Sequence, residues 1–148
     1  MAVGLGLEGV YRIKENVAVT TKLAVLWLFV AVSNSAIITI ALLAPGVIDD
    51  IRSGQVLGAQ IGPELLLVMA ITYYWIPLVM SVLSVTLKNS INRWANIIAG
   101  MLYAFFVLNE MISNIVSVAY FYGIMMHVSE VVIVALIVWF AWKWPKET

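Results

Sequence analysis

The sequence predicts an all-α polytopic membrane protein, a single domain over residues 1–148 folded as an up-down bundle of four transmembrane helices. The residues are 64% hydrophobic and only 11% charged, and the mean hydropathy is +1.04, which lies outside the range of soluble globular domains. Four apolar segments, at about residues 20–43, 63–87, 94–121 and 128–144, are separated by stretches with polar, glycine or proline residues. At ~1.5 Å per residue, such segments cross most or all of a hydrocarbon core of ~30 Å.

The composition also excludes several classes of protein. A formal net charge of zero provides no basic surface for nucleic-acid phosphates, so we expect no nucleic-acid partner. The chain has no cysteine and one histidine. These counts exclude disulfides and thiolate metal sites, and they argue against a protein-only zinc site or a bis-histidine haem. We therefore expect neither a metal nor a cofactor.

The N-terminal part of the chain leads into the first span. Residues 1–16 mix apolar and charged side chains, a pattern that fits either a short interfacial helix or a frayed tail. Asn16 is a suitable N-cap for the span at 20–43, which Pro45-Gly46 ends. Asn34 lies near the middle of this span, where asparagine hydrogen-bonds between helices more often than it binds a ligand.

The second span has a clear start and an interruption. It follows the long loop at 46–62, which we expect on the extracytoplasmic side, and begins at Gly62-Pro63-Glu64, a sequence that suits a helix N-terminus. Pro77 lies inside the span and has no N–H, so the Tyr73 carbonyl loses its usual donor. The result is either a packed kink or a free carbonyl that faces a cavity.

The third span carries a polar stripe. At about 100° per residue, one face of this helix collects Asn96, Gly100, Tyr103, Val107, Glu110, Asn114 and Ser117. The four-residue spacing of Gly100 and Ala104 allows close packing against another helix. An ionised Glu110 exposed to lipid would cost ~2.5–3.5 kcal/mol, and no Lys or Arg lies at its level in any span. We therefore expect a neutral acid hydrogen-bonded to Asn114 or to a tyrosine, or a carboxylate in a hydrated pocket.

A tight connection at 124–129 is predicted to precede the fourth span. It contains His127, and Glu130 follows at the start of the helix. A histidine and a glutamate three residues apart could act as an acid–base pair. Near a helix start they more often complement the helix dipole, so we do not predict an enzyme.

The basic residues predict the orientation. Arg52 stands alone on one side, whereas the other side has seven cations: Arg12, Lys14, Lys22, Lys88, Arg93, Lys143 and Lys146. The positive-inside rule then places both termini in the cytoplasm, and we expect the bundle in the plasma membrane.

Three short stretches resemble parts of an uncharacterised family of small prokaryotic four-helix integral membrane proteins. They are Asn92-Arg93-Trp94-Ala95-Asn96-Ile97-Ile98-Ala99-Gly100, Trp27-Leu28-Phe29-Val30, and Glu130 with the later run from Leu136 to Trp144. The resemblance covers most of the chain. It implies the four-span topology and a role for Arg93, Trp94, Asn96 and Glu130, but no activity.

Depth along the spans places a candidate ligand or proton site in the outer half of the bundle. Its members are Asn34, Tyr73, Tyr103, Glu110, Asn114, His127 and Glu130. Intramembrane carboxylates commonly serve ion and proton pathways, which favours a small-solute or ion transporter or channel-like protein.

Two alternatives remain. The stripe could be packing by Asn96, Gly100 and Ala104, which predicts a non-catalytic homo-oligomeric scaffold or an accessory membrane subunit. The outer half could instead bind a lipid or a quinone.

Overall fold

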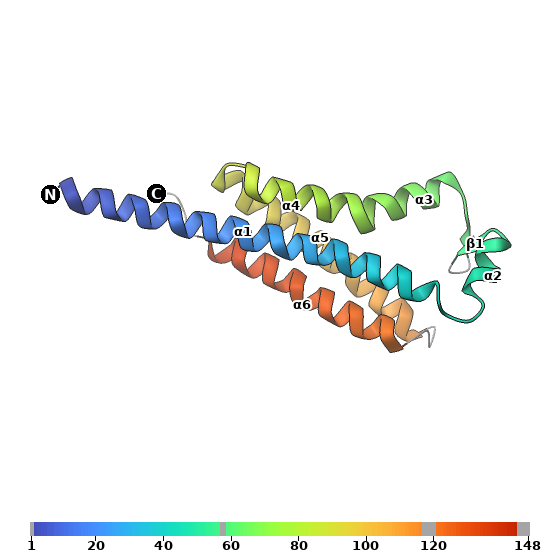
Figure 1. The fold of residues 1–148 in the computed structure, drawn as a ribbon. Coiled ribbons are helices and arrows are strands. Elements are labelled where there is room, and N and C mark those ends of the chain that lie inside the picture. The colour runs from blue at the N-terminus through green and yellow to red at the C-terminus, as the bar shows by residue number, and fades with distance from the viewer. Residues whose placement is uncertain (1, 57–58, 117–120, 145–148) are drawn as a thin grey trace.

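The computed structural model describes residues 2–56, 59–116 and 121–144 (Figure 1). Three long helices are α1 (Ala2–Ala41), α5 (Asn89–Val116) and α6 (Phe121–Lys143). A fourth is continuous through three segments, α3 (Pro63–Met69), the π-helical η1 (Ala70–Trp75) and α4 (Ile76–Thr86). Between α1 and α3 lie a short helix, α2 (Val47–Arg52), and two antiparallel strands, β1 (Gln55–Val56) and β2 (Ala59–Gln60).

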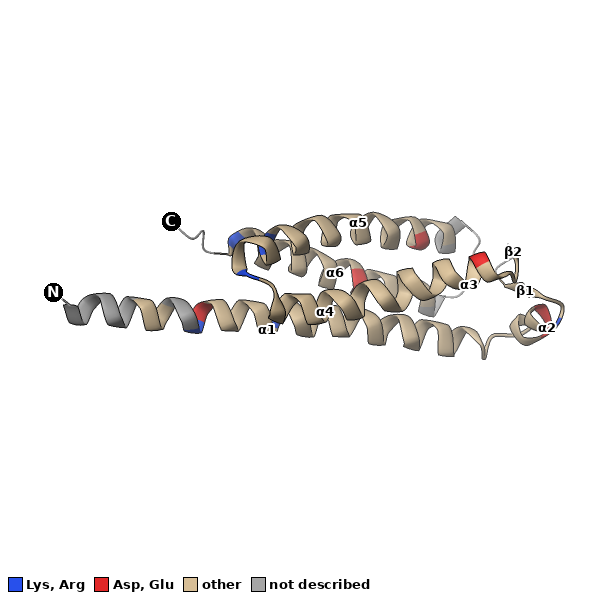
Figure 2. Cartoon of the chain, turned by 90° about the horizontal axis from the view of Figure 1, so that it is seen from above, with Lys and Arg blue, Asp and Glu red and all other residues tan. Residues whose placement is uncertain are grey.

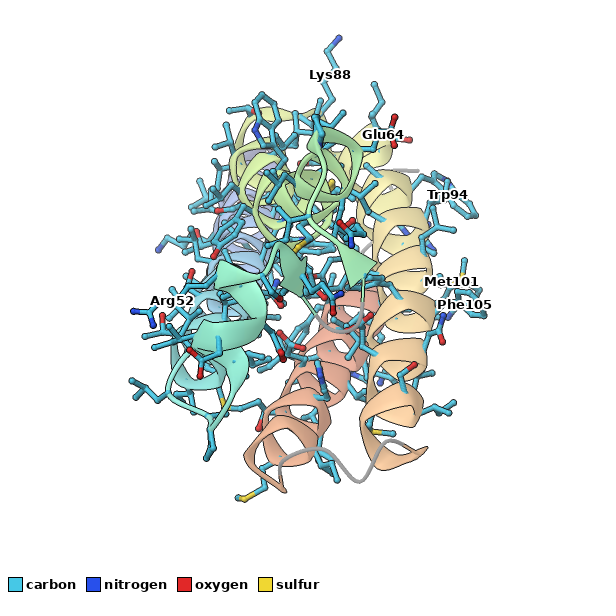
Figure 3. The ribbon with its side chains drawn as sticks, turned by 90° about the vertical axis from the view of Figure 1, so that its right-hand side faces the viewer. Arg52, Glu64, Lys88, Trp94, Met101 and Phe105 are labelled. Atoms are coloured by element: carbon cyan, nitrogen blue, oxygen red, sulfur yellow. The ribbon has the colours of Figure 1, made fainter. Side chains whose placement is uncertain are left out.

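The prediction of an all-α chain with four candidate spans is confirmed. Over the described residues, four helices are long and apolar enough to cross a membrane. Large apolar side chains cover their outer faces, and Trp94, Met101 and Phe105 point from α5 away from the other helices (Figure 3). Helices that are apolar on all sides are typical of a membrane span. The chain is therefore described as a membrane protein.

The helices run side by side along most of their length. α6 packs most extensively against α5, and α1 lies between α4 and α6. Figure 1 shows both termini at one end of the bundle and α2 at the other. Figure 2 shows the basic residues of the long helices gathered at the end with the termini. We call the half of the bundle toward α2 the outer half, and the cytoplasmic location of the termini stays a prediction.

The N-terminal region differs from the expected interfacial helix or frayed tail. α1 continues through it without a break, so its 40 residues reach about 60 Å, twice the hydrocarbon thickness. Asn16 is consequently inside a helix and is no N-cap. Its Oδ1 atom accepts a hydrogen bond of 2.9 Å from Trp144 Nε1, which ties α1 to the end of α6.

The start of α6 also differs from the expectation. The residues expected as a connection, 124–129, are helical, because α6 begins at Phe121. Gly123 lies within the helix despite its low helical propensity. In lipid every backbone N–H and C=O group has to be paired internally, which favours extension of a helix over an irregular loop. The extension places His127 and Glu130 inside the helix.

Candidate functional site

The outer half of the bundle is organised by the break in the second span. Pro77 cannot donate to the Tyr73 carbonyl, and its ring would collide with that carbonyl in a regular α-helix. The structure relieves this collision with a wider π-helical turn over Ala70–Trp75, which ends two residues before the proline. Such π-helical segments are rare in proteins, and those that occur are often found at functional sites.

Asn34 of α1 binds the carbonyl that Pro77 leaves without its usual donor. The side chain is buried, and its Nδ2 atom donates to the Tyr73 carbonyl oxygen at 2.9 Å. Nδ2 also donates to the Tyr103 hydroxyl at 2.7 Å. The Asn34 amide group thus donates both of its N–H groups, and the two acceptors lie on different helices. The freed carbonyl therefore faces a protein donor rather than a cavity.

Glu110 of α5 is bound by the π-helical segment. The Tyr73 hydroxyl donates to Glu110 Oε2 at 3.2 Å, and both side chains are half-buried. The ring of Phe106 contacts the rings of Tyr73 and Tyr103, with centroids 5.5 and 5.7 Å away. These contacts hold the two phenol rings in fixed positions. Of the partners expected for Glu110, the structure provides a tyrosine.

α6 contributes a buried acid–base pair to the same region. His127 Nδ1 lies 3.1 Å from Glu130 Oε2, and the side chains are 4% and 1% exposed. Both the Tyr73 and Tyr103 hydroxyls lie within electrostatic range of Glu130. The pair does not complement a helix start, as the sequence suggested, because α6 begins six residues before His127 and dipole effects fade within the first turn.

Six of the predicted site residues therefore come together, and we call them the outer cluster: Asn34, Tyr73, Tyr103, Glu110, His127 and Glu130. The side chains of Asn114 and Ser117 lie outside the described residues. The described residues include no group of three or more His, Asp or Glu that could hold a metal ion.

The cations of the bundle lie away from the outer cluster. Lys22 sits over the Phe140 ring at 5.3 Å, and Lys143 sits over Trp139 at 4.3 Å. Arg93 donates to the carbonyl oxygens at the end of α6, those of Ala141 and Trp142, at 3.2 and 3.3 Å. Among the residues that Figure 2 colours, no Lys or Arg lies between this end and α2. The outer carboxylates are thus not paired with a described Lys or Arg.

A second buried network lies nearer the termini, and we call its members, Trp27, Ser84, Asn92 and Asn96, the inner network. Trp27 Nε1 and Ser84 Oγ both donate to Asn96 Oδ1, at 2.7 and 3.1 Å. Asn96 Nδ2 donates to Asn92 Oδ1 at 2.7 Å and to the Asn92 carbonyl at 2.9 Å. Asn92 Nδ2 donates to the Ser84 carbonyl at 2.6 Å. The network joins α1, α4 and α5.

The sequence prediction singled out Asn96 but missed its partners. The available signal was the four-residue spacing of Asn92 and Asn96, which puts two asparagines on one face of a helix. Trp27 stood in another of the stretches that carried the family resemblance. Helical periodicity identifies a face but not the residue that faces it, so the pairing with α1 could not be deduced.

Gly100 lies at the close contact between α5 and α6. A Cβ atom added there would lie 2.8 Å from Val138 Cγ2 and 3.6 Å from Ile137 Cγ2. Ala104 is half-buried and lines an apolar groove between the same two helices. The small-residue pair therefore packs within the chain, a possibility that the sequence could not separate from packing between subunits.

Three grooves on the described surface have mostly apolar walls, and none of these three includes a residue of the outer cluster. One lies between α5 and α6 and includes Met101 and Trp139. The others lie beside Phe140 and along α4 at Trp75. The groove beside Phe140 also includes Thr21 and Lys22, whereas the groove along α4 is lined by Trp75, Leu78, Val79, Val82 and Leu83.

Comparison with known proteins identifies a family. The model of a family of unknown function, DUF6326, matches residues 11–148, which confirms the prediction of an uncharacterised family. No curated protein and no solved structure matches the chain.

Proposed function

The chain belongs to the family of unknown function DUF6326, and we propose that it binds and passes a small cation or other small solute at the outer cluster, with Glu110 as the charged group. The observation that carries this proposal is the bond from the Tyr73 hydroxyl to Glu110 Oε2, at 3.2 Å. It links a carboxylate inside a membrane span to the one interrupted stretch among the four described spans.

The depth of Glu110 supports the proposal. The middle of α5 (Asn89–Val116) falls near Tyr103, so Glu110 lies about 10 Å toward α2 at ~1.5 Å per residue. That position is inside the hydrocarbon layer, whose half-thickness is about 15 Å. Carboxylates at such depths are costly and characteristically mark pathways for ions or protons.

The interrupted helix also supports the proposal. Membrane proteins tolerate irregular backbone where it is buried in protein or lines a cavity, and unwound segments supply carbonyl oxygens to cations. Here the Tyr73 carbonyl is held by Asn34 at 2.9 Å. The cluster offers a carboxylate, Glu110, and carboxylate oxygens are among the ligands that hard cations prefer.

Flux measurements in vesicles test the proposal. Purified protein is reconstituted with a pH-sensitive dye inside the vesicles, and a potassium diffusion potential drives proton entry. Glu110→Gln is expected to lower the flux at least tenfold, and the same assay with a sodium-sensitive dye covers the other cation. Glu64→Gln is the matched control, because Glu64 is an exposed carboxylate in the first turn of α3. Equal fluxes of both ions through wild type and Glu110→Gln would sink the proposal.

A second candidate function, an oligomeric scaffold, is favoured by Asn109. This asparagine is exposed on α5 beside Glu110, at a depth where lipid provides no hydrogen-bond partner. A second copy of the chain could supply one, since interhelical amide bonds stabilise membrane assemblies by up to ~2 kcal/mol.

The absence of cysteine from the sequence allows a clean test of this second candidate. A lone cysteine at Asn109→Cys is expected to form disulfide-linked dimers in membranes. Val82→Cys, at an exposed position of α4, is the control and should stay monomeric. Monomers from both variants would remove the scaffold candidate.

A further inference from the structure

Glu130 has an unsatisfied oxygen atom in the interior of the bundle. Its Oε2 atom is paired with His127 Nδ1 at 3.1 Å. Its Oε1 atom is buried and has no hydrogen-bond partner. Every other buried side-chain nitrogen or oxygen atom of the described residues has one. With 1% of the side chain exposed, bulk water does not provide the missing bond.

The hydrogen-bond partners of the Glu130 carboxyl group determine whether its neutral or its ionised form is favoured. An ionised carboxylate in an apolar interior needs donors on both oxygens, and an orphaned charged oxygen carries the full cost of its lost hydration. A neutral carboxylic acid avoids most of that cost, because its charge is removed. The acid also keeps its carbonyl-type oxygen, Oε2, as an acceptor for the His127 Nδ1–H group.

Among the described residues, the groups around Glu130 offer no other neutralising charge. α5 brings Tyr103 and Glu110, and η1 brings Tyr73, so all three are neutral or negative. The polar residue that α1 supplies to the cluster, Asn34, is uncharged.

The described cations that reach α6 do so far from Glu130. Lys22 lies at Phe140, and Arg93 lies at Ala141 and Trp142. These positions are at least ten residues further along the helix, or about 15 Å at ~1.5 Å per residue. His127 is the only described side chain in hydrogen-bond contact with the carboxyl group that could carry a positive charge.

We propose that Glu130 is a proton-binding site, a neutral carboxylic acid whose proton sits on Oε1 while neutral His127 donates from Nδ1 to Oε2. The ligand is the proton itself, which needs no cavity. Loss of that proton leaves a carboxylate whose one described donor is His127. This inference rests on the proposed function in one respect: it names the proton as the ion that the outer cluster holds.

Infrared spectroscopy of the protein in lipid at neutral pH tests the proposal. A protonated glutamic acid has a carbonyl stretching band that an ionised carboxylate lacks, and the band shifts in heavy water. We expect wild type to show a component that Glu130→Gln removes and Glu110→Gln leaves. If no component depends on Glu130, or if the same component survives in folded Glu130→Gln, the proposal is overturned.

His127→Gln keeps the test decisive if Glu130→Gln does not fold. With a neutral acid in wild type, the band stays in His127→Gln and only shifts in frequency, because the proton remains on Glu130. With an ion pair between imidazolium and carboxylate, wild type lacks the band and His127→Gln gains it. That gain would overturn the proposal.

The spectroscopic result is independent of transport. A Glu130 band in a protein whose flux does not depend on Glu110 would sink the proposed function alone. Conversely, a flux that depends on Glu110 in a protein without the band would sink the protonated Glu130 alone.

Discussion

The inner network and the outer cluster are both buried polar groups in an apolar bundle, yet they differ in composition and in completeness. The inner network contains only neutral amide, indole and hydroxyl groups, and Asn96 alone takes part in four bonds of 2.7–3.1 Å. The outer cluster contains two carboxylates, a histidine and two phenols, and it leaves Glu130 Oε1 without a partner. A ring contact between Trp27 and Tyr103, with centroids 5.7 Å apart, connects the two.

This difference distinguishes polar residues that stabilise the fold from polar residues that can bind a proton or a ligand. A neutral network with every member paired fixes the relative positions of the helices and has no group that changes charge. Titratable groups that are incompletely paired stabilise less, and they can change protonation or take a ligand. In this bundle the inner network holds the helices together, whereas the outer cluster carries the chemistry that we propose.

The largest effect on stability is expected for Asn96→Leu. The substitution leaves the buried atoms Trp27 Nε1 and Asn92 Oδ1 without the partner that Asn96 provides, at ~1–3 kcal/mol each, so we expect a loss of about 3 kcal/mol of unfolding free energy. Thermal unfolding in detergent measures it. Asn109→Leu is the control and should melt like wild type, because Asn109 is exposed. If both variants have the same melting temperature, the inner network does not stabilise the fold.

Asn34→Leu is expected to have the next largest effect and to affect both stability and function. It removes the bonds to the Tyr73 carbonyl and the Tyr103 hydroxyl, and the loss should be about 2 kcal/mol because each unpaired buried group costs ~1–3 kcal/mol. Unlike Asn96→Leu, it should also lower the vesicle flux per folded molecule. A destabilised variant with full flux would show that Asn34 belongs functionally with the inner network.

Glu110→Gln should change stability by less than about 1 kcal/mol, because the amide oxygen still accepts from the Tyr73 hydroxyl and a single bond contributes ~0.5–1.5 kcal/mol. The flux should nevertheless fall at least tenfold. This contrast between stability and activity is the expected mark of the outer cluster. A large drop in melting temperature would instead assign Glu110 a structural role.

Tyr73→Phe should have the smallest effect on the flux. It deletes one half-buried hydroxyl and keeps the ring contact with Phe106, so the melting temperature should fall only slightly, by the equivalent of ~0.5–1.5 kcal/mol. The flux should fall less than in Glu110→Gln. If Tyr73→Phe abolished flux entirely, the hydroxyl rather than the carboxylate would be the indispensable group.

The spans and the main members of the outer cluster could be predicted because both depend on local sequence. Apolar length identifies a span, and the position of Glu110 along its span gives its depth. Pro77 also shows by its chemistry that the Tyr73 carbonyl loses a donor. Partners across helices could not be predicted, because the sequence does not give the rotation of one helix against another. The donor from Asn34 and the bond from Trp27 to Asn96 both depend on that rotation.

The extension of α6 escaped prediction for a different reason. Gly123 and the polar residues at 127–130 have the composition of a loop. Packing against the other helices and the apolar lipid around the bundle nevertheless favour a helix. The prediction therefore placed His127 outside the helix and favoured a helix-dipole role for the pair with Glu130, which their position beyond the first turn of α6 excludes.

The π-helical segment also changes the angular phase of the helix that contains it. Its wider turn accommodates one more residue than an α-helical turn, so α3 is rotated by about 100° relative to an unbroken helix continued from α4. A single helical wheel drawn over Pro63–Thr86 consequently assigns wrong faces to one of its halves. Removal of one residue from Ala70–Trp75 would turn the outer part of this helix about its axis far more than it would shorten it.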